Sequence, residues 1–220
     1  TLAKWVKEFG TVGSVVMCTN GNKGTSDRNM TSEKLAATRV IEQQDASNIV
    51  GVTDVVFLGH PDGGLEDTLS FRSQVTREIR RFKPDLILCI DPYRSKTHTH
   101  RDHRKSGQVA LDAAFSYAWS YQHFPEHITE EGLEPHRVDQ AFLWGGEEPD
   151  VFVDIQNYLE VKADSLGAHV SQMSSNREER LERIKTNSGR HKEMTGLDYA
   201  EGFRKISFNL GSLDWQLMHR

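Results

Sequence analysis

The sequence predicts an α/β protein in which a mostly parallel sheet is flanked by helices. Short apolar runs, with the length of buried strands, alternate along the chain with longer segments that repeat apolar residues at helical spacing. This alternation is typical of βαβ units around a parallel sheet. With 220 residues, 36% of them hydrophobic, the chain is long enough for a substantial core. We therefore expect a single domain over residues 1–220.

The elements of the first half are marked by apolar runs, capping residues and glycines. Gly10 ends the first helix, Thr31 or Ser32 caps the second helix, and Gly51 ends it. The expected elements are a helix over residues 1–9, a strand over 12–18, a helix from the Thr31–Ser32 cap to about residue 49, a strand over 54–58, a helix over 69–82 and a strand over 86–90.

The second half continues the alternation less regularly. The expected elements are a helix over residues 109–121, a polar loop over 126–136, strands over 141–144 and 151–155, and helices over 158–173, 177–185 and 199–205. The chain opens on a helix, although each helix of an alternating fold should follow a strand. We therefore expect that the first strand of the fold is missing from this sequence.

Composition excludes several classes of function. The formal net charge is −5, so the chain lacks the basic surface that nucleic-acid binding requires. No apolar stretch approaches the ~20 residues of a membrane span, and no signal-peptide pattern opens the chain. The two cysteines, Cys18 and Cys89, lie in apolar runs and are expected to be free thiols. These features predict a cytoplasmic protein.

A histidine-rich stretch, residues 97–104, lies between the strand over 86–90 and the next helix. Open α/β sheets place their sites at the carboxyl ends of strands, which is the position of this stretch. His100 and His103 can face one point if His103 lies on the first turn of the helix. Imidazoles with a carboxylate between them suit a zinc ion or an acid–base relay. The alternative is a solvated polar loop before a helix.

In the functional interpretation, His103 is the candidate zinc ligand, and His100 stabilises a developing oxyanion or acts as a general acid. Asp102 orients a histidine, and His98 lines the pocket. A catalytic zinc needs about three protein ligands, so this stretch alone gives an incomplete site. Asp91 and His98 are the candidates for substitute ligands beside His103 if this chain holds zinc.

Arg39 and Asp62 each have a structural and a functional interpretation. Arg39 has Glu42 three residues later, a spacing that suits a surface ion pair of small energy, and Asp62 lies in a Pro-Asp-Gly sequence that suits a turn. In the functional interpretation, Asp62 accepts hydrogen bonds from substrate hydroxyls and Arg39 donates to the same substrate. We do not expect His60 to bind metal, because no second carboxylate follows Asp62.

Together these segments resemble the PIG-L/LmbE-like family of zinc-dependent N-acetylglucosamine deacetylases over nearly the whole chain. The matching segments are Thr19-Asn20-Gly21 with Gly24, Arg39-x-x-Glu42, residues 58–65, His100-Arg101-Asp102-His103, Val153-Asp154-Ile155, residues 162–172 and Ala200-Glu201-Gly202-Phe203. The resemblance implies a Rossmann-like sheet, a Zn²⁺ ion held by a His, an Asp and a second His, and a small-molecule N-acetyl sugar as substrate. It also implies a homo-oligomer, either a trimer or a hexamer.

The resemblance assigns roles to individual residues. His103 corresponds to the second histidine ligand, His100 to the residue that stabilises the tetrahedral intermediate, and Asp102 to the carboxylate that orients it. Arg39 and Asp62 correspond to the residues that contact the sugar. His98 falls where some members of the family carry a tyrosine near the reacting carbonyl.

One family segment is not found in this sequence. The His-Pro-Asp-Asp-Glu segment, which supplies the general base and the other two zinc ligands, should come just before Thr1, so we expect an N-terminally incomplete domain. The first hypothesis is a parent protein that removes the N-acetyl group from an N-acetylglucosamine-type substrate. The second is a non-catalytic carbohydrate- or nucleotide-binding module of the same fold. A third is hydrolysis of another small amide by the same zinc chemistry.

Overall fold

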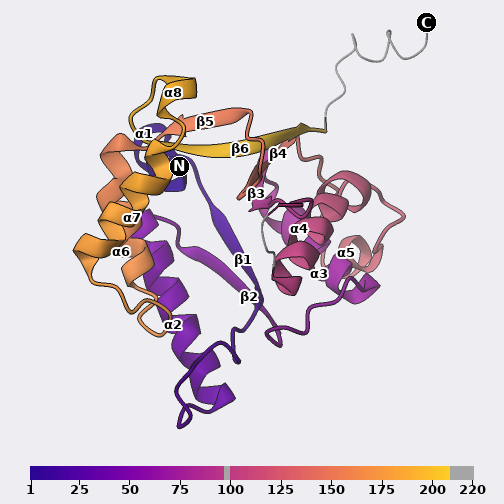
Figure 1. The fold of residues 1–220 in the computed structure, drawn as a ribbon. Helices are drawn as coiled ribbons and strands as arrows, with labels where there is room; N and C mark the ends of the chain where they lie inside the picture. Colours follow the sequence, from indigo (N-terminus) through magenta and orange to yellow (C-terminus); the bar gives the residue numbers. More distant parts are fainter. Residues whose placement is uncertain (97–99, 209–220) are drawn as a thin grey trace, which may run out of the picture. The chain divides into compact units, whose positions relative to one another are not determined.

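The computed structural model describes residues 1–96 and 100–208 (Figure 1). The chain divides into two compact units. The first unit comprises Thr1–Leu65 and Phe152–Gly202, and the second comprises Glu66–Val151 and the chain from Phe203 onward. Helices and strands alternate along most of the chain, as the sequence predicts, and the α/β class is confirmed. The single domain remains a prediction.

The first unit contains a parallel pair of strands, β1 (Ser14–Thr19) and β2 (Asp54–His60). Ser14 lies opposite Asp54, and the register continues to Met17 and Phe57. Helix α2 (Ser32–Val50) connects the two strands, which makes a βαβ unit. Both strands therefore end at the same edge of this sheet, where their exit loops carry polar side chains.

Helix α2 begins and ends, and helix α1 (Leu2–Phe9) ends, at the predicted capping residues. The side chain of Thr31 accepts a hydrogen bond from the Lys34 N–H, and α2 ends at Gly51, which has φ = 92°. Helix α1 ends at Gly10 in the left-handed conformation. Helix α6 (Leu159–Gly167) packs against both α2 and α7 (Arg177–Gly189), and α8 (Lys192–Thr195) follows α7 (Figure 1).

The second unit is built around strands β3 (Leu86–Ile90) and β4 (Gln140–Trp144), which pair in parallel. Helix α4 (Arg101–Asp112) packs against β3, and α3 (Leu69–Phe82) packs against α4 (Figure 1). A π-helical turn, Ala113–Tyr117, continues α4, and the short helix α5 (Glu126–Thr129) follows.

The C-terminal segment corrects one element of the sequence analysis. Residues 199–205, expected to be a helix, instead contribute to strand β6 (Ala200–Ser207), which runs antiparallel to β4. Phe203 is buried opposite Trp144, and its ring lies 5.7 Å from that of Phe142. Cross-strand packing therefore decides the conformation of a segment whose short sequence does not distinguish helix from strand.

Strand β5 (Val151–Asp154) lies next to β6 in the sheet order. The boundaries of the two compact units fall within β5 and β6, so each of these strands contributes to both units. Cys18 and Cys89 are free cysteines, as expected, and burial raises the pKa of the Cys89 thiol to about 12. In the described part of the chain, no helix combines the length and apolar content needed to cross a bilayer.

Candidate functional site

The first set of candidate residues lies at the exits of β1 and β2, within the first unit. The Asn20 N–H donates to the His60 carbonyl at 2.9 Å, and the Asp62 N–H donates to the Asn22 side-chain oxygen at 3.2 Å. These bonds connect the two exit loops. The turn at Asp62 is itself closed by the Gly64 N–H, which donates to the Pro61 carbonyl at 3.1 Å.

Arg39 extends from α2 into the loop that follows β1. Its guanidinium donates to the carbonyl oxygens of Gly21 and Gly24, and its Nη1 lies 3.9 Å from the Asp62 carboxylate. The Arg39 and Asp62 side chains are only 14% and 19% exposed. The planar Arg39 guanidinium therefore binds two carbonyls of the loop after β1 and faces the Asp62 carboxylate of the loop after β2.

Gly21 is required by this arrangement for two reasons. Its φ of +63° lies in the left-handed region, and a Cβ at this position would lie 2.5 Å from the Arg39 Nη1. Any larger residue would strain the loop and displace the guanidinium. The glycine of the Thr19-Asn20-Gly21 motif is therefore explained by the close approach of the Arg39 guanidinium to this loop.

Glu42 does not form the surface ion pair that its spacing from Arg39 suggests. Its side chain is buried, and its two carboxylate oxygens accept hydrogen bonds from the Ser171 N–H and hydroxyl at 2.6 and 2.7 Å. No local sequence pattern pairs Glu42 with Ser171, which lies 129 residues further along the chain. Only the tertiary structure brings these two residues together.

The second set of candidate residues lies at the N-terminus of α4, within the second unit. His100 is the N-cap residue, and its Nδ1 accepts a hydrogen bond from the Asp102 N–H at 3.2 Å. This bond places the proton of the neutral imidazole on Nε2. The Asp102 carboxylate is buried and lies 3.9 Å from the same Nδ1, whereas the His100 side chain is 48% exposed.

His103 lies in the first turn of α4, which is the condition for His100 and His103 to face one point. The two imidazole ring centres are 5.4 Å apart. The edge of the Trp144 ring, at the end of β4, meets His103 at a centroid distance of 6.4 Å. Trp144 was not a candidate in the sequence analysis, although it ends an expected strand.

Asp91 is not available as a substitute metal ligand. The Arg204 guanidinium donates to both of its carboxylate oxygens at 2.8 Å, and the Tyr93 N–H donates to one of them. Burial of the Asp91 carboxyl opposes its ionisation, but these hydrogen bonds hold its pKa below the ordinary value. Asp91 therefore joins the end of β3 to β6 through an ion pair whose carboxylate is buried. His98, the other candidate, lies outside the described residues.

The chemistry of the donor set tests whether these residues fit a zinc ion. His103 offers an imidazole on the first turn of a helix, which suits one ligand of such a site. Among the residues that the structure describes, neither unit by itself brings three histidine, cysteine or carboxylate ligand atoms within reach of one another. The second unit can therefore supply one zinc ligand, His103, but its described residues do not form a complete zinc site on their own.

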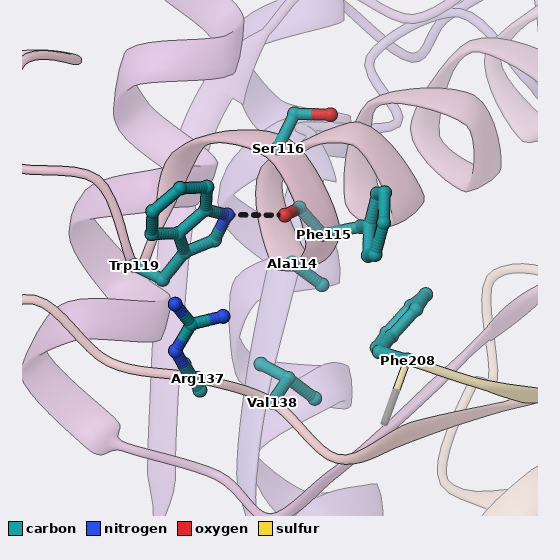
Figure 2. A pocket seen from close by; sticks show the side chains of 7 residues that line it. All are labelled: Ala114, Phe115, Ser116, Trp119, Arg137, Val138 and Phe208. Atoms are coloured by element: carbon teal, nitrogen blue, oxygen red, sulfur yellow. Dashed lines mark hydrogen bonds between the residues drawn. The ribbon is translucent and has the colours of Figure 1, made fainter. Parts of the chain in front are cut away.

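The second unit also contains a pocket of about 350 Å³ on the π-helical turn (Figure 2). The Trp119 indole N–H donates to the Phe115 carbonyl at 2.7 Å, and the Arg137 guanidinium lies 4.5 Å from the Trp119 ring centre. Ala114, Ser116, Val138 and Phe208 complete the lining. None of the candidate residues named from the sequence lines this pocket.

Comparisons with known proteins give a consistent result. The family model described as PIG-L, GlcNAc-PI de-N-acetylase, matches residues 1–114. A diacetylchitobiose deacetylase from Thermococcus kodakarensis is 30% identical over 192 residues, which is 87% of this chain and 71% of that protein. A 1D-myo-inositol 2-acetamido-2-deoxy-alpha-D-glucopyranoside deacetylase from Mycobacterium sp. strain KMS is 23% identical. The aligned region covers 79% of this chain and 68% of that protein. The solved structure of an N,N'-diacetylchitobiose deacetylase from Pyrococcus horikoshii has a TM-score of 0.85 and 25% identity, with coverage of 97% of this chain and 81% of that chain.

Proposed function

The chain belongs to the PIG-L (GlcNAc-PI de-N-acetylase) family, and we propose that it is a zinc-dependent hydrolase of N-acetylglucosamine-type small molecules. The reaction is hydrolysis of the N-acetyl amide, which gives acetate and a free amine. The observation that carries this proposal is the 30% identity to a diacetylchitobiose deacetylase over 87% of the chain. Two relatives whose names specify N-acetylated amino sugars support this class of substrate.

We assign the chemical step to residues at the N-terminus of α4. The Nε2–H of His100 is the donor to the oxyanion of the tetrahedral intermediate, because its Nδ1 is occupied by the Asp102 N–H. The buried Asp102 carboxylate lies 3.9 Å from the His100 Nδ1 and orients the imidazole. General-acid catalysis toward the leaving amine is the alternative role of the same ring.

His103 is proposed to be one zinc ligand, supplied by this chain on a rigid helix turn. A bound zinc ion would polarise the amide carbonyl and lower the pKa of a water molecule. The neighbouring Trp144 ring limits the orientations open to the His103 imidazole. This proposal requires only one ligand from the second unit.

Arg39 and Asp62 are proposed to bind the sugar. The Asp62 carboxylate accepts hydrogen bonds from sugar hydroxyls, and the Arg39 guanidinium, already held by two loop carbonyls, orients the carboxylate and donates to the substrate. His98 is proposed to line the substrate pocket, and it lies outside the described residues. A cytoplasmic homo-oligomer, either a trimer or a hexamer, is part of the proposal through the family resemblance.

The product of the complete gene, supplied with zinc, tests the proposal directly. We expect release of acetate from N,N'-diacetylchitobiose or from an N-acetylglucosaminyl inositol, loss of activity with a chelator, and recovery with zinc. His100→Ala should lower kcat about 100- to 1,000-fold, because it removes an oxyanion donor. Gln108→Ala, at an exposed position on the same helix, is the matched control and should retain activity.

A single outcome would reject the proposal, and a binding measurement then tests the alternative. A folded, zinc-supplied protein that releases no acetate from any N-acetylated amino sugar is not a deacetylase of this class. If that protein still binds the saccharide, the non-catalytic carbohydrate-binding alternative is favoured instead.

A further inference from the structure

Strands β3 and β4 end side by side, and hydrogen bonds join the loops that follow them. The Asp91 N–H donates to the Trp144 carbonyl at 2.9 Å, directly after the pairing of Ile90 with Trp144 in the parallel register. The Glu147 carboxylate accepts hydrogen bonds from the Ser95 N–H and hydroxyl, each at 2.9 Å. Trp144 is therefore held at the carboxyl end of β4, the edge at which open α/β sheets bind their ligands.

The Trp144 ring lies beside the two histidines of α4. Its centre is 6.4 Å from that of the His103 ring, and the two ring planes are inclined at 65°. The His103 ring centre is in turn 5.4 Å from that of His100. The indole is therefore the neighbour of the imidazole pair to which the chemical step is assigned.

The Trp144 side chain is largely free of the core. Trp144 is 46% exposed, whereas Phe142 and Leu143 before it are buried. Within residues 1–96 and 100–208, its indole N–H has no hydrogen-bond partner, unlike that of Trp119, which donates to the Phe115 carbonyl. A single exposed hydrophobic side chain is common and by itself indicates nothing. The position of this one, next to His103, gives it access to whatever binds there.

The distance between Trp144 and His103 suits the sugar ring that carries the reacting group. An acetamide has the dimensions of a peptide group, so its carbonyl oxygen lies about 3 Å from the ring carbon that bears the nitrogen. A sugar whose acetamide reaches the histidines therefore has its ring within reach of an indole centred 6.4 Å from His103. One face of a pyranose consists of C–H groups, which pack against the flat apolar face of an aromatic ring, and sugar hydroxyls accept hydrogen bonds from an indole N–H.

We propose that Trp144 binds the sugar ring that carries the acetamide, with the indole face packed against the C–H groups of the ring and the indole N–H donating to one of its hydroxyls. The inference rests on the proposed function, which supplies the sugar and the histidines, and it deepens that function by assigning a further substrate-binding residue. It also assigns a preference, because a small amide without a sugar ring gains nothing from the indole.

The experiment measures the dissociation constant of chitobiose for the complete, zinc-supplied protein by titration calorimetry. This disaccharide keeps both sugar rings but has no acetyl group, so it is not hydrolysed. Trp144→Ala removes the ring and should weaken binding about tenfold. Trp144→Phe keeps an aromatic face but loses the N–H, and it should stay within about threefold. Tyr121→Ala, which removes another exposed aromatic ring of the second unit, is the matched control and should bind as the wild type does.

Three further measurements separate contact with the sugar from a structural role of Trp144. Chitobiose should change the intrinsic fluorescence of the wild type, and Trp144→Phe should remove most of that change, although three other tryptophans remain. The zinc content of folded Trp144→Ala should equal that of the wild type, because the proposal does not act through His103. The ratio of kcat/KM for N,N'-diacetylchitobiose to that for N-acetylethanolamine, an acyclic amide, should fall about tenfold in Trp144→Ala.

Separate outcomes reject the two proposals. A folded Trp144→Ala protein with the wild-type dissociation constant, or an unchanged fluorescence response in Trp144→Phe, would overturn the role of Trp144 in sugar binding. Loss of zinc together with loss of saccharide binding would also overturn it, because Trp144 would then act through His103. If the wild type releases no acetate but binds chitobiose through Trp144, the deacetylase proposal fails while the binding role of Trp144 stands.

Discussion

Gly107 determines how closely α4 approaches β3, and replacing it with alanine tests whether the position of that helix matters for catalysis. A Cβ at this position would lie 2.3 Å from the Ile90 carbonyl oxygen and 3.2 Å from Pro92 Cδ. Carbon–oxygen contacts rarely fall below about 3.3 Å, so α4 must move by about 1 Å. Because His103 and His100 lie four and seven residues earlier on the chain, the movement is transmitted directly to them.

The expected cost follows from two opposing effects. Overpacking against the backbone costs about 1–3 kcal/mol, and the better helix propensity of alanine returns about 1 kcal/mol. We expect Gly107→Ala to lower the free energy of unfolding by about 1–2 kcal/mol. Misplacement of catalytic groups by about 1 Å should reduce kcat about 100-fold. The activity loss should therefore be much larger than the stability loss alone explains.

The assay combines urea unfolding with the rate of acetate release from the zinc-supplied protein. Gly189→Ala is the matched control, because this glycine also lies in a helix but its Cβ would approach Asp198 only to 3.6 Å. We expect it to keep full activity and to gain up to about 1 kcal/mol of stability. A Gly107→Ala protein with wild-type kcat would refute the claim that the packing of α4 on β3 positions the reacting groups.

Three further predictions concern binding, stability and pH. Asp62→Asn should weaken binding of the saccharide product about 10- to 100-fold in titration calorimetry, because the charged acceptor is lost; an unchanged dissociation constant would remove Asp62 from the sugar site. Arg80 is completely buried and donates to five backbone carbonyls between Tyr117 and Phe124, so Arg80→Lys should lower the free energy of unfolding by about 2–4 kcal/mol in urea, whereas a loss below about 1 kcal/mol would contradict this network. Burial, together with the charge of Arg80, lowers the pKa of His127, so between its folded pKa and about 6.5 the unfolded state binds more protons and stability falls as the pH decreases. His127→Gln should therefore lose less stability than the wild type between about pH 7.5 and about pH 5.5, and equal losses would show that His127 does not contribute.

The regular elements of the fold could be predicted because local signals agree with the tertiary structure. The helix over Leu69–Phe82 and the strand over Leu86–Ile90 have the observed bounds, and Gly51 ends its helix as expected. Residues 199–205 were wrongly expected to be helical because their pairing with β4 is set by residues about 60 positions earlier in the chain. Helix α4 starts at Arg101, before the apolar run that marks this helix in the sequence, and its N-cap is a histidine, which is unusual in that position.

The candidate residues could be named from the sequence, but their partners could not. The histidines and Asp102 follow a strand at short spacing, so a local motif identifies them. The bonds from Ser171 to Glu42 and from Arg204 to Asp91 connect residues more than 100 positions apart, and no short pattern contains them. The spacing of Arg39 and Glu42 even suggested the wrong pair, because the two side chains bind different loops.

Acetate release by the complete, zinc-supplied gene product is the most direct test of the central claim. Incubated with N,N'-diacetylchitobiose, the wild type should produce acetate and a free amine in equal amounts, and His103→Ala should produce neither above background because it removes a proposed zinc ligand. Deacetylation that persists in the His103→Ala protein at the wild-type rate, or a wild type that deacetylates no amino sugar, would contradict the account.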